Sequence, residues 1–135
     1  MKFKFLEHTA DIKFLAFGKN KEEAFENSAL ALKEVICGKI KIKENKEKKI
    51  KVKGKDFESL LYVFLEEILF LLEGKNFIIS SIKELKIKGF NLSAVIVGDE
   101  TKNYHFSNKV KAVTYSDMII EHDKGKWKIQ AVLDV

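Results

Sequence analysis

The chain has 135 residues, of which 46% are hydrophobic and 33% are charged. This length fits one domain, residues 1–135, and the composition excludes the intrinsically disordered class. The formal net charge of +5 comes from 25 basic residues, and all of them are lysines. Because arginine is the usual reader of guanine and a preferred partner of phosphate, its absence argues against sequence-specific nucleic-acid recognition.

The start of the chain lacks the apolar stretch of a signal peptide, and no later apolar run approaches the ~20 residues needed to cross a bilayer. We therefore expect a soluble, cytoplasmic protein that does not enter a membrane. The lone Cys37 has no partner for an internal disulfide and is expected to be a small buried residue.

Alternation of apolar and polar residues predicts strands at 2–5 and 12–17, with a polar segment between them. A helix is predicted next. Asn20 is placed to cap its first turn, Glu23 stands at the third helical position, and Gly38 ends it.

Residues 39–55 alternate isoleucine or valine with lysine, which predicts a half-buried hairpin that turns at residues 44–49. One face of this hairpin would carry a row of lysines, namely Lys41, Lys43, Lys51 and Lys53. Such a row is either a phosphate-binding stripe or a solvated edge that discourages aggregation, and the second interpretation is the commoner one.

Asp56 is placed to cap a second helix whose apolar positions extend almost all round. We expect this helix to pack on two sides, against a sheet and against a second layer or a partner. The rest of the chain is predicted to form strands at 77–82, 85–87, 92–97, 109–115, 118–121 and 127–133, with turns at 89–91, 98–100 and 124–125. Two helices and about eight strands predict an α+β fold, in which the helices pack on antiparallel or mixed sheets.

Three kinds of catalytic site are excluded. There is no glycine-rich phosphate loop and no nucleophile elbow, and the three histidines lack zinc-ligand spacing. Oxygen ligands remain, because Asp11 lies in a polar loop and Asp134 precedes Val135 with its α-carboxylate. If the last strand runs beside the first, these carboxylates converge and favour a hard cation such as Ca²⁺. Spacing alone favours the alternative, in which Asp11 caps a loop and the final residues fray.

Several segments resemble the archease family. Residues 8–12, His-Thr-Ala-Asp-Ile, are similar to the signature that opens archeases, and residues 110–115, Val-Lys-Ala-Val-Thr-Tyr, are similar to a strand near their end. The terminal Val132-Leu133-Asp134-Val135 resembles their closing aspartate and aliphatic residue, and residues 22–27 and 60–67 match their two helices. The resemblance runs from Phe5 to Val135 in the right order.

The resemblance implies a chaperone-like activator that is not itself an enzyme. Archeases promote guanylylation and multiple turnover of the RtcB-type tRNA-splicing RNA ligase and broaden its nucleotide use. The implied partner is this ligase, with tRNA as a further, indirect partner, and the resemblance leaves open whether RNA is contacted directly. The implied fold is built from strand-helix-strand-strand modules. The implied ligands of a divalent ion, typically Ca²⁺, are Asp11, Asp134 and Val135, and Lys111 and His8 are implied at the functional surface.

Three positions depart from the family pattern: Ser116 stands where histidine is frequent, Phe64 where tryptophan is usual, and Lys13 where glycine is usual. Two other functions remain open from the residues alone. One is a metal-dependent hydrolase that uses the same carboxylates, and the other is a lysine-rich RNA-binding module.

Overall fold

The structure is a computed structural model that describes residues 1–7 and 10–135. The chain order of the elements is β1 (Phe3–Leu6), β2 (Ile12–Gly18), α1 (Lys21–Cys37), β3 (Lys46–Lys53), α2 (Phe57–Lys75), β4 (Phe77–Lys88), β5 (Asn91–Glu100), a short 3₁₀ helix η1 (Thr101–Asn103), β6 (Ala112–Asp123) and β7 (Lys126–Asp134). No helix in the described part of the chain is long and apolar enough to cross a membrane.

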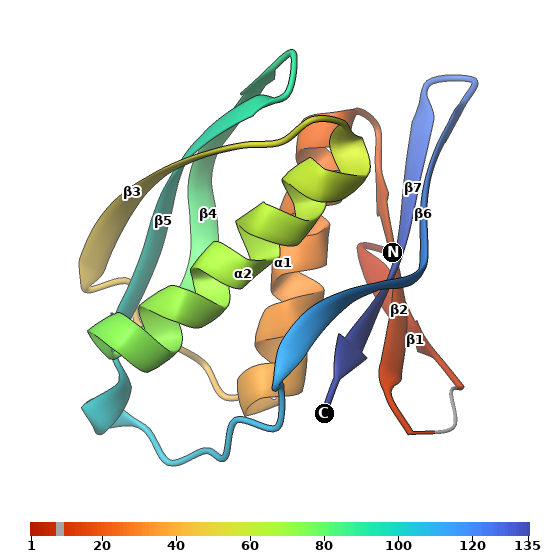
Figure 1. The fold of residues 1–135 in the computed structure, drawn as a ribbon. Coiled ribbons are helices and arrows are strands. Elements are labelled where there is room, and N and C mark those ends of the chain that lie inside the picture. Colours follow the sequence, from red (N-terminus) through yellow and green to blue (C-terminus); the bar gives the residue numbers. More distant parts are fainter. Residues whose placement is uncertain (8–9) are drawn as a thin grey trace.

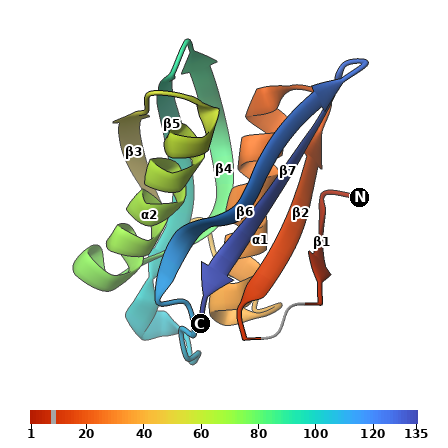
Figure 2. The ribbon, with the colours of Figure 1, turned by 45° about the vertical axis from the view of Figure 1, so that its right-hand side comes forward.

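The strands form two antiparallel sheets, and the two helices lie between them (Figures 1 and 2). The four-stranded sheet has the order β1-β2-β7-β6, and the three-stranded sheet has the order β3-β5-β4. Helix α1 contacts β2, β4 and β7, while α2 contacts β3, β4 and β6, so each helix touches both sheets. The predicted α+β fold is confirmed. The apolar circumference of α2 is explained by burial against two layers of its own chain.

Helix α1 begins and ends as predicted. The Asn20 side chain accepts a hydrogen bond from the backbone N–H of Glu23 at 2.8 Å, and the Glu23 carboxylate accepts one from the backbone N–H of Lys19 at 3.0 Å. At the other end Gly38 has a φ of 67°, a backbone conformation that favours glycine, and its N–H donates to the carbonyl of Glu34. Cys37 is buried at 5% exposure, as expected, and burial raises the pKa of its thiol.

Helix α2 starts with a capping box. The Asp56 carboxylate accepts from the N–H of Ser59 at 2.7 Å, and the Ser59 hydroxyl accepts from the N–H of Asp56 at 3.2 Å. Along the buried face Phe64 is fully enclosed, and its ring lies 6.2 Å from that of Phe25 in α1. Phe64 is therefore a core residue.

The predicted hairpin over residues 39–55 is wrong. Only Lys46–Lys53 form a strand, and this strand pairs with β5. Residues 39–45 are held by side chains from elsewhere: Ser80 Oγ donates to the carbonyl of Ile42 at 2.7 Å, and the Tyr104 hydroxyl accepts from the N–H of Lys43 at 2.8 Å. Lys41 and Lys43, the members of the predicted lysine row in this segment, therefore do not continue the row of β3.

Two predicted strand breaks are bulges inside longer strands. Strand β4 is continuous, with register shifts between Ile79 and Ser81 and between Ile82 and Glu84. Strand β6 is continuous past a shift between Thr114 and Ile119. The predicted turn at residues 98–100 belongs to β5, and residues 109–111 precede β6 instead of starting it. A bulge interrupts the alternation of side chains without ending the strand. In the sequence, this interruption looks the same as the end of a strand.

Candidate functional site

The two aspartates singled out by the sequence lie at the same end of adjacent strands. Strand β2 pairs with β7, and Ile12 is opposite Leu133. Asp11 immediately precedes Ile12, and Asp134 immediately follows Leu133. The last strand thus runs beside the second strand and not the first, because β1 occupies the outer edge of the sheet. The β2–β7 register therefore places Asp11 and Asp134 at the same end of two paired strands.

Strand β6 contributes to the same end of the sheet from the other side of β7. Ala112 is opposite Asp134, and the backbone N–H of Lys111 donates to the carbonyl of Asp134 at 2.7 Å. The side chain of Lys111 is exposed. The structure therefore brings together Asp11, Lys111, Asp134 and Val135, whereas His8 lies outside the described residues.

Helix α2 fixes the segment that carries Lys111. Asn108 accepts a hydrogen bond from the N–H of Val110 at 2.9 Å, and its amide donates to Glu73 at 3.4 Å. The Glu66 carboxylate accepts from the N–H of Val113 at 3.3 Å. Because both glutamates belong to α2, the entry into β6 is anchored to a buried helix and the position of Lys111 is set by the core.

The carboxylates of Asp11 and Asp134 are both half-buried, and neither forms a hydrogen bond or an ion pair with another described side chain. The atoms that these two side chains offer to a metal are carboxylate oxygens, which are the ligands that hard cations such as Ca²⁺ prefer.

Within the described residues, no three His, Cys, Asp or Glu side chains are grouped so that they could hold a metal ion. The set implied by the resemblance contains only two such side chains, and its third member is the α-carboxylate of Val135. A site of this composition leaves positions for water or for a ligand from another molecule, which Ca²⁺ tolerates.

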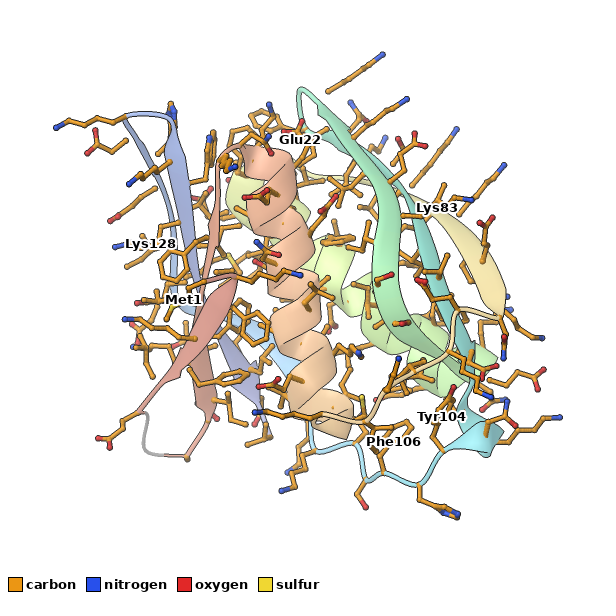
Figure 3. The ribbon with its side chains drawn as sticks, turned by 180° about the vertical axis from the view of Figure 1, so that it is seen from behind. Met1, Glu22, Lys83, Tyr104, Phe106 and Lys128 are labelled. Carbon is orange, nitrogen blue, oxygen red and sulfur yellow. The ribbon has the colours of Figure 1, made fainter. Side chains whose placement is uncertain are left out.

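A cavity of about 700 Å³ opens beside Asp11, between the β1–β2 end, the C-terminal end of α1 and residues 105–109. Its lining includes Glu7, Glu34, His105 and Lys109 as well as Asp11. Figure 3 shows Phe106 of the same segment below the end of α1. Sequence reasoning missed His105 and Lys109, because they follow β5 in an irregular segment without a motif and only the fold brings them to Asp11.

The two surface departures from the family pattern lie around the bulge of β6. Ser116 is exposed, and its N–H donates to Thr114 Oγ1 at 3.1 Å. Lys13 in β2 forms an ion pair with Asp117 at 3.3 Å, across the intervening strand β7. The Tyr115 ring stacks on Tyr62 of α2 with centroids 4.4 Å apart. The ion pair between Lys13 and Asp117 therefore links β2 to the bulge of β6.

Two antiparallel sheets that enclose two helices define an α+β protein, in which Asp11, Asp134 and the exposed Lys111 share one end of the four-stranded sheet. The chain matches the model of the "Archease protein family (MTH1598/TM1083)" over residues 3–135. It is 36% identical over 140 residues to "Protein archease" of Methanosarcina mazei, covering 99% of this chain and 96% of that protein. It is 41% identical over 135 residues to "Protein archease" of Pyrococcus abyssi, covering 96% and 95%.

Solved structures agree with these relatives. The solution structure of protein 1598 of Methanobacterium thermoautotrophicum superposes with a TM-score of 0.83 at 35% identity, covering 99% of both chains. The crystal structure of a Thermotoga maritima protein described as "an archease, possible chaperone" has a TM-score of 0.69 at 22% identity, covering 98% of this chain and 96% of that one, and it supports the fold alone. The chain belongs to the archease family.

Proposed function

We propose that this protein is a non-enzymatic, cytoplasmic activator of an RtcB-type tRNA-splicing RNA ligase. It would promote guanylylation and multiple turnover of the ligase and broaden the ligase's use of nucleotides. The observation that carries the proposal is the β2–β7 register, which places Asp11 and Asp134 at one sheet end beside Lys111. Membership in the archease family supports it, and "possible chaperone", the phrase used for the Thermotoga maritima protein, is compatible with an activator.

In this proposal Asp11, Asp134 and Val135 hold Ca²⁺ or another hard divalent cation. The ion would supply positive charge that balances the negative charge of its carboxylate ligands. The chain's own contribution is to position these oxygens from two paired strands. The exposed Lys111 would meet a phosphate group or an acidic side chain of the ligase, as a mobile point charge.

Calorimetric titration with Ca²⁺ tests the ion site. The wild type is expected to bind, and Asp11→Asn and Asp134→Asn are expected to lose at least about tenfold in affinity, because each removes a charged ligand. Asp123→Asn is the matched control, since Asp123 is exposed at the opposite end of β6 and β7. Equal affinity in all four proteins would refute the ion site.

Activation is tested with limiting ligase, excess RNA ends and GTP. The wild-type protein is expected to raise the number of ligations per ligase molecule and the fraction of guanylylated ligase. Asp11→Asn and Asp134→Asn should fail to do so while their circular dichroism and thermal unfolding stay unchanged. If the wild type gives no increase in turnover, the proposed function is wrong. If phosphate were released from substrates without ligase, in a manner dependent on Asp11, the hydrolase alternative would replace it.

A further inference from the structure

The outer face of the three-stranded sheet carries a basic hollow of about 480 Å³, far from the aspartate pair. Four lysines line it, two from each edge strand: Lys51 and Lys53 of β3, and Lys86 and Lys88 of β4. Asn91 and Ser93 of the central strand β5 line it between them. We call these six residues the lysine cradle.

Strand register explains why the lysines surround the two polar residues. Ser93 is opposite Lys51 on one side and Lys86 on the other, and Asn91 is likewise flanked by Lys53 and Lys88. Side chains at directly opposed positions share a sheet face. The outer face therefore carries two neighbouring cross-strand rows, and in each row a polar residue of β5 lies between two lysines. From strand geometry, the lysines are spaced by about 7 Å along a strand and about 10 Å across the sheet.

Charge is segregated along this sheet. Toward the end of the sheet nearer η1, the lysines are neutralised in pairs: Lys46 bonds Glu100 at 2.8 Å, and Lys83 bonds Glu47 at 2.8 Å. In the cradle only Lys86 has an acidic partner, Glu84 at 3.1 Å. Lys51, Lys53 and Lys88 form no ion pair within the described part of the chain. Three of the four cradle lysines thus carry positive charge without an ion pair among the described residues, as do Lys48 and Lys49 further along β3.

We propose that the lysine cradle binds the phosphate backbone of an RNA strand. Lysine, serine and asparagine are among the side chains that contact phosphates and sugars in nucleic-acid complexes, and together they make up the polar side chains of the cradle. The apolar Val52 and Leu92 also line the hollow, but Leu92 is only 1% exposed, and the central strand presents Asn91 and Ser93 between the lysines. A protein partner would instead need buried aromatic or aliphatic anchors at the centre of the interface. The choice of RNA over DNA rests on the function proposed above.

The cradle and the aspartate pair lie at opposite ends of the molecule. Lys88 and Asn91 flank the β4–β5 turn, and Figure 1 shows this turn and the C-terminus at opposite ends. Lys83 projects from the same sheet in Figure 3, on the side away from α1. An RNA strand on the cradle would therefore leave the acidic sheet end free to contact a ligase, so the activator would hold RNA and enzyme at once.

The test is binding of a fluorescein-labelled 20-nucleotide RNA to the protein alone, followed by anisotropy at several KCl concentrations in EDTA. No ligase and no divalent ion is present, so the outcome is independent of the function proposed above. The variant Lys51→Gln/Lys53→Gln/Lys86→Gln/Lys88→Gln should lose at least about tenfold in affinity at 0.1 M salt. The slope of log K against log salt should become shallower by about 2 to 3, since each phosphate contact on a single strand contributes about 0.7.

The matched control is Lys4→Gln/Lys19→Gln/Lys39→Gln/Lys41→Gln, which changes the net charge equally at exposed lysines outside the cradle. It should retain nearly wild-type affinity and slope. The double variant Lys53→Gln/Lys88→Gln, which keeps one lysine on each edge strand, should show about half the change in slope and guards against aggregation of the quadruple variant. The proposal is wrong if the wild type does not bind the RNA, or if the two quadruple variants lose the same affinity. It is also wrong if poly-glutamate competes for the protein as well as unlabelled RNA does.

Discussion

The hydroxyl group of Tyr104 donates a hydrogen bond to the carboxylate of Asp99 at 2.7 Å and accepts one from the backbone N–H of Lys43 at 2.8 Å. Asp99 is only 3% exposed and also accepts from the N–H of Glu100 and from the side chains of Asn103 and Asn45. The bond from Tyr104 lowers the pKa of Asp99 and outweighs the opposing effect of burial. One carboxylate thereby ties β5, η1 and residues 43–45 together.

Replacing Tyr104 by phenylalanine should destabilise the protein. The change removes a donor from a buried carboxylate and an acceptor from the Lys43 N–H, and unpaired buried polar groups are costly. We expect the melting temperature to fall by several degrees in differential scanning calorimetry. Tyr115→Phe is the control, because Tyr115 is 53% exposed and its hydroxyl makes no hydrogen bond within the described residues. A similar loss in both variants would contradict this account.

The lowered pKa of Asp99 makes part of the stability depend on pH. A carboxyl whose pKa is lower in the folded state stabilises the fold above its ordinary value of about 3.9, and this contribution is lost as the pH falls through the lowered folded value. We therefore expect Asp99→Asn to melt below the wild type at pH 7. The difference should narrow as the pH falls below 4. A difference that stays constant from pH 7 to pH 2 would show that the Asp99 charge is not responsible.

Gly98 should tolerate no side chain, although nothing about its φ requires glycine. It lies in β5, and a Cβ there would overlap the carbonyl oxygen of Ile78 and stand 2.9 Å from Phe77 Cζ. Gly98→Ala should cost about 1–3 kcal/mol or more in urea unfolding, because backbone has to shift. Gly89→Asn is the contrast: Gly89 has a φ of 60° with no atom near its Cβ position, and asparagine adopts that conformation more readily than other residues. It should be nearly neutral.

Two phenylalanines of α2 should differ sharply when truncated. Phe64 is fully buried, whereas Phe70 is 53% exposed on the same helix. Phe64→Ala should lower the free energy of unfolding by about 3–5 kcal/mol, through lost burial and the cavity left behind. Phe70→Ala should change it by less than about 0.5 kcal/mol. Urea titrations of both variants measure this directly. Because alanine has a higher helix propensity than phenylalanine at either position, equal losses would contradict the assignment of the difference to core burial.

Local signals predicted both helices and three of their four caps, because Asn20, Asp56 and Gly38 act through neighbours within four residues, while the C-cap Asn76 of α2 was not predicted. Strand partners could not be predicted in the same way. Alternation in residues 46–53 shows which face is buried, but it does not reveal that β3 pairs with β5 and not with residues 39–45. The aspartate pair was predicted through a family resemblance, while the β2–β7 register that explains it depends on contacts between distant residues.

The lysine cradle also depends on contacts between residues that are distant in the sequence. The sequence grouped Lys51 and Lys53 with Lys41 and Lys43, since all four share one alternating run. The fold instead pairs the first two with lysines of β4 across β5, and it directs residues 39–45 to Ser80 and Tyr104. The composition of a surface that is built from three strands depends on which strands pair. The alternation within one segment does not reveal that pairing.

The position of β7 between β2 and β6 has a consequence for biosynthesis. Ile12 pairs with Leu133, so β2 must wait for its partner until almost the whole chain has been translated. The three-stranded sheet and both helices are complete in sequence by residue 100, ahead of β6 and β7. The four-stranded sheet closes only after β7 emerges from the exit tunnel. The acidic sheet end is therefore among the last parts of the molecule to form.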